Sequence, residues 1–361
     1  MTRTHTLVAA TFSLSLITSI SVGAQASAAG TQLQAAAEKV KKPRKGPFFE
    51  TIEPLAITFT TDIRRIRGDK EDQAPWRTAK ISYTAPDGKP VVIPAQVRTR
   101  GIWRLKTCEF PPIRINFTSE DLKGTLLQGL DKPKLVSYCK DNDLYEQYVL
   151  QELQLYRVYS LLTPLSHRAR PLRVTYVDST SGKTEATRYA FVIDEPAEVA
   201  LRNKAKVLEL KGARAEDLDS FHRALVGVFQ YFIGNTDYSI NGLHNAELIQ
   251  TEDGIVFPIA YDFDFSGAVN ARYATVDPSL SVRRVRERLM RGYCAEPGDF
   301  EKVFALFNEK KPAIWALYAD PVGQLLRPKV VEETLAYFED FYKTINNPRA
   351  AKQEIVDNCR K

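Results

Sequence analysis

Residues 234–245 read GNTDYSINGLHN, and residues 259–267 read IAYDFDFSG. The second stretch places two acids, Asp262 and Asp264, inside an aromatic run that is typical of a β-strand. A buried carboxylate is costly unless it is paired or holds a cation. Residues two apart on a strand point to the same side, and two carboxylates on one side suit a divalent ion with oxygen ligands. We therefore predict a metal site at Asp262 and Asp264.

The loop before this run offers two further polar side chains, Asp237 and Asn245. Both can complete the metal site, and Asn241, four residues after Asp237, competes with Asn245 for that role. Structural alternatives stay open for the acids. Asp237 can cap a turn in a loop rich in Gly, Asn and Ser, while Asp262 and Asp264 can form a salt-bridged or turn-capping pair.

Strand-like segments dominate the chain before this loop. Alternating apolar residues, with interrupting Gly and Pro, predict strands at 56–60, 80–83, 91–93, 95–100, 113–117, 134–138, 172–177 and 188–193. Apolar residues at helical spacing predict a helix that Asn142 or Asp143 caps and Pro164 ends. After it we expect a helix at 215–233, a hairpin at 246–259 and mainly helices from 285 onward.

The first residues are typical of a secretory signal peptide. Arg3 precedes an uncharged, mostly apolar run at 7–24, and small residues then offer cleavage after Ala26 or Ala28. A transmembrane anchor is the alternative, but the run is rich in Ser and Thr and short for a span of about 20 apolar residues. We assign 1–28 to a signal peptide and 29–47 to a basic, disordered linker. We expect an exported protein, periplasmic or extracellular, with no stable membrane span after cleavage.

The composition is that of a globular protein, because 44% apolar and 26% charged content exclude a disordered or fibrous chain. The net charge of +6 is concentrated near the N-terminus. Arg3 contributes one positive charge and the linker contributes four, since its five bases stand against Glu38, so the rest of the chain carries only +1. A nearly neutral folded part gives no electrostatic basis for binding nucleic acid, and we expect no such partner.

Four cysteines are present, at 108, 139, 294 and 359. Disulfides persist in exported proteins, and an even number of cysteines suits them. We expect Cys108 to pair with Cys139 and Cys294 with Cys359, because each bond then joins residues of one half of the chain. A zinc site is the alternative, but the chain lacks the C-x-x-C spacing that such sites use.

Nucleophilic hydrolase chemistry is disfavoured, because no G-x-S-x-G motif occurs and the cysteines are expected to be structural. His167, His222 and His244 are expected to be structural or surface residues, and only His244 lies near the predicted site.

Several short motifs occur in the order used by a known family. They are RTRGIWR at 98–104, KLVSY at 134–138 before the long helix, and FVIDE at 191–195 at the end of a hairpin. The loop with Asp237 and Asn245, a β-hairpin and the Asp-Phe-Asp element follow, as in kinase-like folds. Over this region the chain resembles the spore coat protein H (CotH-like) family of atypical kinases, distant relatives of the secretory-pathway protein kinases.

The resemblance implies an ATP-dependent phosphotransferase. Asp237 would orient or deprotonate the hydroxyl of a protein or small-molecule acceptor, and Asn245 and Asp262 would hold Mg²⁺ or Mn²⁺, with Asp264 as an additional or alternative ligand. One or more basic side chains would bind the nucleotide phosphates, and Glu152 of the long helix could pair with one of them. The candidate bases are Arg100, Arg114 and Lys134.

The resemblance also implies an α+β, two-lobed atypical protein-kinase-like fold, with a β-rich N-lobe at 48–195 and a mainly helical C-lobe at 196–361. The chain departs from ordinary protein kinases in three ways. The loop lacks His-Arg-Asp, Asn245 follows Asp237 by eight residues rather than about five, and no G-x-G-x-x-G loop is present.

Other functions stay open. One is a noncatalytic, exported, pseudokinase-like binding protein, since a fold does not imply an activity. Another is a different metal-dependent enzyme with an Asp-x-Asp pair, such as a phosphohydrolase or a glycosyltransferase. The basic residues also have a structural alternative, in which Arg98, Arg100, Arg104 and Arg114 form a solvated strand face.

Overall fold

The computed structural model describes residues 2, 46–71, 74–101 and 103–361. The predicted signal peptide (1–28) and linker (29–47) lie outside the described residues, apart from residues 2, 46 and 47. The described residues from 46 onward belong to one compact unit, Glu38–Lys361. None of the helices in the described ranges is long and apolar enough to cross a membrane.

Seven strands form a closed barrel in the order β1-β2-β3-β4-β5-β7-β6. All neighbours are antiparallel except β1 and β6, which pair in parallel and close the barrel. The strands are β1 (Leu55–Thr61), β2 (Arg77–Thr84), β3 (Pro90–Thr99), β4 (Ile113–Asn116), β5 (Lys134–Val136), β6 (Ala169–Asp178) and β7 (Thr184–Ile193).

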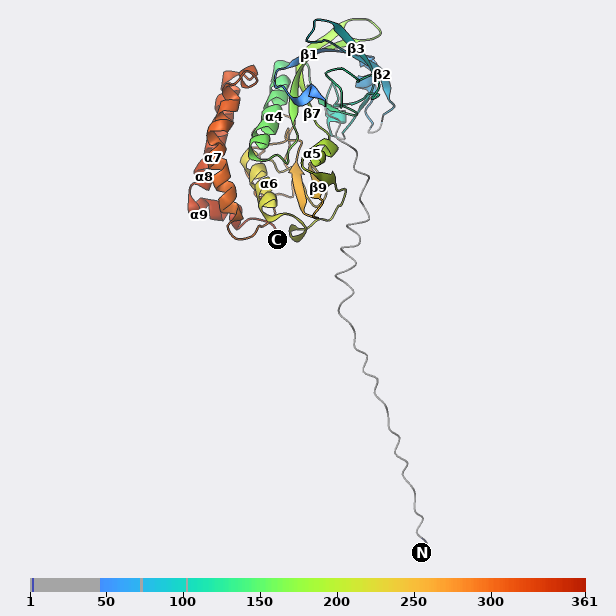
Figure 1. The fold of residues 1–361 in the computed structure, drawn as a ribbon. Coiled ribbons are helices and arrows are strands. Elements are labelled where there is room, and N and C mark those ends of the chain that lie inside the picture. The colour runs from blue at the N-terminus through green and yellow to red at the C-terminus, as the bar shows by residue number, and fades with distance from the viewer. Residues whose placement is uncertain (1, 3–45, 72–73, 102) are drawn as a thin grey trace. The chain divides into compact units, whose positions relative to one another are not determined.

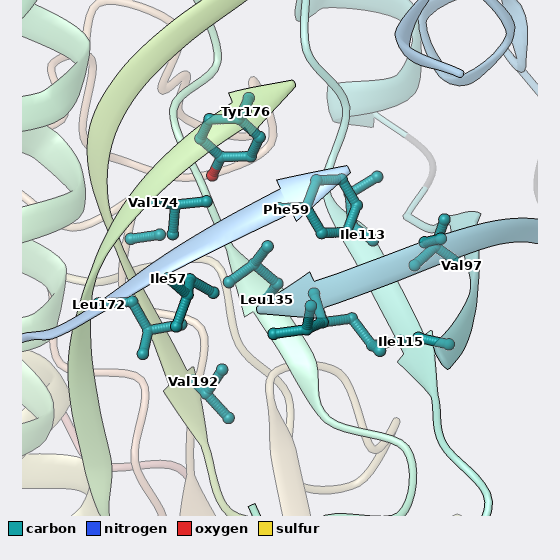
Figure 2. Close-up of a cluster of buried hydrophobic side chains, with 14 of the residues drawn as sticks. Ile57, Phe59, Val97, Ile113, Ile115, Leu135, Leu172, Val174, Tyr176 and Val192 are labelled. Atoms are coloured by element: carbon teal, nitrogen blue, oxygen red, sulfur yellow. The ribbon is translucent and has the colours of Figure 1, made fainter. Parts of the chain in front are cut away.

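The barrel interior is an apolar core. Alternate residues of each strand point inward, as Ile57 and Phe59 of β1 do, and Figure 2 shows these side chains converging with those of the other strands. Phe110, Tyr138 and Tyr176 add rings with centroids 4.9 to 5.3 Å apart. Full burial of such a side chain contributes about 1.5–3 kcal/mol, so this filled interior stabilises the barrel and leaves its outer face for polar groups.

Helices and a small sheet form the rest of the unit. A three-stranded antiparallel sheet has the order β10-β9-β8, and α4 packs against β7 on one side and α7 on another. Figure 1 shows α7 and α8 side by side next to α4 and α6. The strands are β8 (Ala205–Val207), β9 (Ala246–Thr251) and β10 (Val256–Ala260). The helices are α2 (Ile63–Gly68), α3 (Trp103–Thr107), α4 (Asp143–Leu162), α5 (Pro196–Arg202), α6 (Ser220–Ile233), α7 (Asp299–Ala319), α8 (Pro328–Ile345) and α9 (Pro348–Ala351), with short helical turns at Pro47–Phe49, Ala215–Asp217, Gly323–Leu325 and Lys352–Val356.

Local signals in the sequence place several elements correctly. The side chain of Asn142 accepts hydrogen bonds from the backbone at Leu144 and Tyr145, and α4 ends just before Pro164. The β6–β7 and β9–β10 hairpins form as expected. The segment 285–298 is not helical, however, and the first C-terminal helix begins only at Asp299.

The predicted α+β fold with two kinase-like lobes is wrong. The β-rich part is a closed, mixed seven-stranded barrel rather than the sheet of a kinase N-lobe. The physical reason is the parallel pairing of β1 with β6, which joins Leu55 to Leu172. Alternating apolar residues show that a strand has a buried face, but they carry no information about which distant strand lies beside it.

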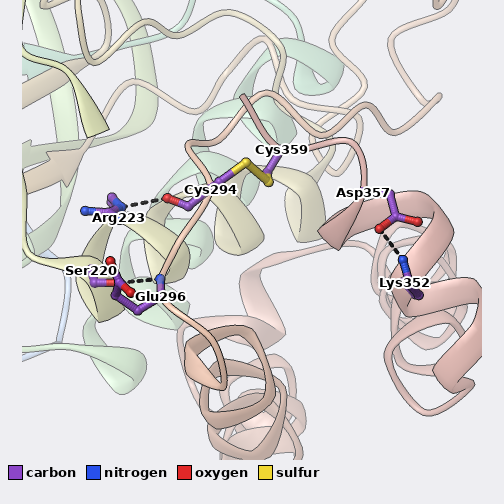
Figure 3. The surroundings of a disulfide bond; sticks show 7 residues. All are labelled: Ser220, Arg223, Cys294, Glu296, Lys352, Asp357 and Cys359. Carbon is purple, nitrogen blue, oxygen red and sulfur yellow. Dashed lines mark hydrogen bonds and ion pairs between the residues drawn. A yellow bond between two sulfur atoms is a disulfide. The ribbon is translucent and has the colours of Figure 1, made fainter. Parts of the chain in front are cut away.

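Both expected disulfides are present. Cys108 is bonded to Cys139, and Cys294 is bonded to Cys359. The second bond joins the segment before α7 to the C-terminal residues, and Figure 3 shows Arg223 of α6 beside it. The Arg223 Nε donates a hydrogen bond of 2.7 Å to the carbonyl oxygen of Cys294. The disulfide joins two parts of the chain, and the hydrogen bond from Arg223 attaches a third part, α6, to them.

Candidate metal and phosphate site

Three acids from two elements meet at one point. Asp262 and Asp264 follow β10, and Glu152 lies in the middle of α4. One carboxylate oxygen from each lies within 4.8 Å of the others. Tyr156, one turn along α4 from Glu152, accepts a hydrogen bond of 2.8 Å from the backbone N–H of Asp262. The helix therefore supplies one acid and also fixes the backbone that carries another.

Burial makes this acidic group costly in the absence of a cation. Glu152 is 1% exposed, and burial together with the charges of Asp264 and Asp262 raises its pKa well above the ordinary value. Burial also raises the pKa of Asp264 to about 6, although Arg104 opposes the shift. In the described part of the chain, Glu152 Oε1 and Asp264 Oδ2 have no hydrogen-bond partner.

Arg104 of α3 offsets part of this charge. Its guanidinium lies 3.6 Å from Asp262 Oδ1 and 3.5 Å from Asp264 Oδ2. Burial acts against its charge, but these two carboxylates raise the pKa of Arg104 above the ordinary value. Arg100 also acts on the acids, and two arginines against three acids leave the group short of positive charge. Three clustered carboxylates, two of which carry a buried oxygen without a hydrogen-bond partner among the described residues, fit a hard divalent cation such as Mg²⁺ or Mn²⁺.

A row of basic side chains crosses the outer face of the barrel. In the strand register Arg98 of β3 lies opposite Arg114 of β4, and Arg114 lies opposite Lys134 of β5. Paired residues share a face, and the neighbours Ile113 and Leu135 point into the core, so this basic row points outward. The charges of Arg100, Asp262 and Arg114 all act on Lys134. The row thus ends near the acidic group.

Arg100 lies at the meeting point of the basic row and the acids. Burial lowers its pKa, Arg104 adds to that effect, and Asp262 opposes it. Its Nε is buried, and no acceptor from the described residues bonds to it. The Arg114 Nε is buried and unbonded in the same way. Arg100, which has an unused Nε donor, acts on the acids, and Arg114, with a second unused Nε donor, belongs to the basic row, so an anion that carries a cation could bind between the row and the acids.

The predicted catalytic loop is held in a fixed shape. Asp237 accepts a 2.9 Å hydrogen bond from His244 Nε2 on one carboxylate oxygen and a 3.1 Å hydrogen bond from Asn245 Nδ2 on the other. Arg291 donates to the Thr236 carbonyl oxygen. Asn245 has a φ of 50°, a left-handed conformation that non-glycine residues adopt mainly where the surrounding structure enforces it.

Asn241 and Asn245, the two candidates for the metal-binding role, make different hydrogen bonds. The Asn241 side chain donates a 3.3 Å hydrogen bond to the Ala213 carbonyl oxygen, whereas Asn245 bonds to Asp237. The amide nitrogen of Asn245 donates to Asp237, and the amide oxygen, Oδ1, is the atom that could bind a cation. Glu152, expected to pair with a base, acts electrostatically on the candidate base Arg100 and also lies with Asp262 and Asp264.

A cavity of about 540 Å³ lies near the Lys134 end of the basic row. Pro133, Ile193, Leu201 and Val207 give it apolar walls, and Asp194 adds polar groups. This volume falls in the range of pockets that hold small molecules, roughly 300–1,000 Å³. No local sequence pattern predicts this cavity, because its walls come from segments that are adjacent only in the folded chain.

No protein-family model matches the chain, and no curated protein matches it either. The likeness to the CotH-like kinases therefore stays a prediction from short motifs. The function has to be inferred from the geometry of the site.

Glu152→Gln is expected to stabilise the metal-free protein and to abolish stabilisation by Mg²⁺ or Mn²⁺. Gln keeps the shape of the side chain but removes a buried charge that lies beside two other acids. We expect the metal-free melting temperature to rise by a few degrees, corresponding to about 1–2 kcal/mol.

Thermal melts of both proteins with and without metal would test this. Glu339→Gln, on the exposed face of α8, is the control and should leave the response to metal unchanged. A lower melting temperature for metal-free Glu152→Gln, together with an intact metal response, would contradict the metal site.

Proposed function

We propose that this protein is an exported, divalent-metal-dependent phosphotransferase that moves a phosphoryl group from ATP to a hydroxyl group of a protein or small molecule. The observation that carries the proposal is the position of Arg100. Its buried, unbonded guanidinium lies between a group of three acids and a basic row. Phosphoryl transfer depends on positioning and on charge neutralisation, and these residue types supply both.

The acids and the bases have different roles in the proposed reaction. Glu152, Asp262 and Asp264 would hold the metal ion, with Asn245 Oδ1 as a further candidate ligand. The bound cation would neutralise phosphate charge and orient the transferred group. Arg100, Arg114 and Lys134 would bind phosphate oxygens from the barrel side. The cavity lined by Pro133 and by Ile193, the strand partner of Lys134, has a size that could take the base of the nucleotide.

Asp237 would act on the acceptor. It orients the acceptor hydroxyl and takes its proton, while the hydroxyl oxygen forms a bond to the γ-phosphorus and the bond from that phosphorus to the β–γ bridging oxygen breaks, so that ADP leaves. Its hydrogen bonds to His244 and Asn245 fix the direction of the carboxylate. Export would place the enzyme away from cytoplasmic ATP, and the two disulfides fit that location.

A phosphohydrolase is the second candidate, and the Asp237–His244 pair favours it. His244 is exposed and lies 2.9 Å from Asp237, so the pair can orient a water molecule as well as a hydroxyl group. The two reactions differ only in the acceptor. Product analysis with γ-labelled ATP separates them, because a hydrolase releases labelled phosphate and a transferase labels an added acceptor.

Asp237→Asn is expected to lower kcat by about 10²- to 10⁴-fold and to leave nucleotide affinity nearly unchanged. The variant removes the proton acceptor but keeps the metal ligands and the basic row. Label transfer from ATP to a mixture of exported proteins and polyols measures the rate, and calorimetry measures affinity.

Asn241→Ala is the matched control, because it changes the same loop but removes only a hydrogen bond to the Ala213 backbone. Its kcat should stay within about twofold of the parent. A transferase that keeps full activity with Asn at position 237 would remove Asp237 from the mechanism. Failure of the parent to turn over ATP with any acceptor, water included, would leave the noncatalytic alternative.

A further inference from the structure

A buried histidine lies behind the Lys134 end of the basic row. His167, between α4 and β6, has no exposed surface. Its Nδ1 lies 2.8 Å from the Asp194 carbonyl oxygen, and its Nε2 lies 3.1 Å from Glu247 Oε2. A neutral imidazole has one donor and one acceptor nitrogen. Because a carbonyl oxygen and a carboxylate oxygen both accept, the contacts of His167 are those of an imidazolium that donates twice.

The groups around His167 keep Glu247 ionised. On its other oxygen, Oε1, Glu247 faces the Lys134 ammonium at 4.0 Å. A carboxylate between two cations is favoured over the neutral acid. Burial would raise the pKa of Glu247, but His167 and Lys134 hold it below the ordinary value. Burial would likewise lower the pKa of His167, but Glu247 and Asp194 raise it to about 9.

The remaining neighbours of His167 are already engaged. Arg168 and Arg202 both donate hydrogen bonds to the Asp194 carboxylate, which leaves the carbonyl oxygen of that residue for the imidazolium. Tyr261 packs its ring against His167 on one side and lies under the Lys134 ammonium, whose nitrogen is 4.7 Å from the ring centroid. Tyr261 directly precedes the proposed metal ligand Asp262.

We propose that His167 is a positioning residue: as a buried imidazolium it fixes Glu247, and Glu247 in turn holds the Lys134 ammonium beside Asp262, where it meets a phosphate oxygen of the nucleotide. The inference rests on the proposed function. It selects Lys134 from the three candidate bases, because the His167–Glu247 pair holds the Lys134 ammonium in position. Lys134 is suited to this role, because the Glu247 carboxylate with which it pairs is 4.0 Å away and its side chain is 22% exposed. A phosphate can therefore reach its N–H donors.

The charge state of His167 is measurable without any activity. In protein labelled with ¹⁵N-histidine, both ring nitrogens of His167 should carry protons at pH 7.5, with the signal assigned by its loss in His167→Gln. Burial lowers the pKa of His222 to about 4, so that residue provides a neutral histidine in the same spectrum. Glu247→Gln should convert His167 to the neutral form at pH 7.5. A neutral His167 in the parent protein overturns the proposal.

A double-mutant cycle tests whether His167 acts through Lys134. Lys134→Met and His167→Gln are each expected to weaken binding of Mg²⁺·ATP by about tenfold, the effect of losing one charge-assisted hydrogen bond. In the Lys134→Met background, His167→Gln should add less than about twofold. Effects that multiply to about a hundredfold would assign His167 a general structural role and overturn the proposal. His222→Gln, which removes another buried histidine, should leave affinity unchanged.

The pH dependence gives a further readout. The folded-state pKa of His167 is about 9, above the ordinary value, so the imidazolium is present at neutral pH and is lost as the pH rises through about 9. Affinity for Mg²⁺·ATP should fall over that range in the parent protein. Burial also lowers the pKa of the Lys134 ammonium below its ordinary value, so His167→Gln should show a smaller fall than the parent protein. If the parent protein binds no nucleotide at any pH, the proposed function fails, whereas the ¹⁵N spectrum still decides the charge of His167.

Discussion

Asp262→Asn is expected to abolish metal-dependent binding of ATP while leaving the protein folded. Asp262 belongs to the acidic group, lies 3.6 Å from Arg104 and acts electrostatically on Arg100 and Lys134, so it influences both the acidic and the basic parts of the site. Asn is chosen because Asp262 has a φ of 61°, and Asn tolerates this left-handed conformation better than Ala. The substitution therefore removes charge without adding backbone strain.

The measurement is a thermal shift. For the parent protein, metal and ATP at about 100 times the Kd should raise the free energy of unfolding by about 2.7 kcal/mol, or the melting temperature by roughly 5 °C. Asp262→Asn should show no rise. Glu252→Gln, an exposed acid at the far end of the β9–β10 hairpin, should respond like the parent. An undiminished shift in Asp262→Asn would exclude the metal site.

Removal of the Cys294–Cys359 disulfide should produce the largest loss of stability. The bond spans 65 residues, and loop-closure entropy alone gives about 4 kcal/mol for a loop of that size. The same region is tightly packed, since a Cβ on Gly292 would lie 2.5 Å from the Gly227 Cα. We expect the double variant Cys294→Ser/Cys359→Ser to melt about 8–12 °C lower than the parent.

A nearby ion pair provides the control. Lys352 and Asp357, also drawn in Figure 3, form an exposed salt bridge. Exposed ion pairs contribute little, so Lys352→Gln should change the melting temperature by at most about 2 °C. Calorimetry of the three proteins, with the parent also measured under reducing conditions, gives the comparison. Equal melting temperatures for the parent and the double cysteine variant would show that packing alone fixes the C-terminal segment.

Short-range signals in the sequence were sufficient for individual elements. Asn142 caps α4 and the turn at Asp253-Gly254 ends β9, because these residues act on the backbone within a few positions. Closure of the barrel depends instead on β1 lying beside β6, and no local pattern encodes that pairing. The two-lobed expectation failed for this reason.

The part of the candidate site that the sequence indicates is the pair of acids, Asp262 and Asp264, two positions apart. Asp262 and Asp264 stand out because acids are rare in an apolar run, and the structure brings them together with Glu152. Glu152 was predicted to pair with a phosphate-binding base, and its position beside Asp262 and Asp264 was not predicted. The contact between His167 and Glu247 was missed, because the two residues are 80 positions apart and a single histidine before a strand has no distinctive pattern.

The parallel pairing of β1 with β6 also determines the order in which this chain can fold during synthesis. Leu55 is made long before its partner Leu172, and at about 5–20 residues per second the delay is of the order of ten seconds. Throughout that delay β1 has β2 on one side and an open edge on the other, which can pair with a wrong strand. Strands β1 to β5 can pair in order as the chain emerges, but the barrel closes on β1 only after β6 has been made.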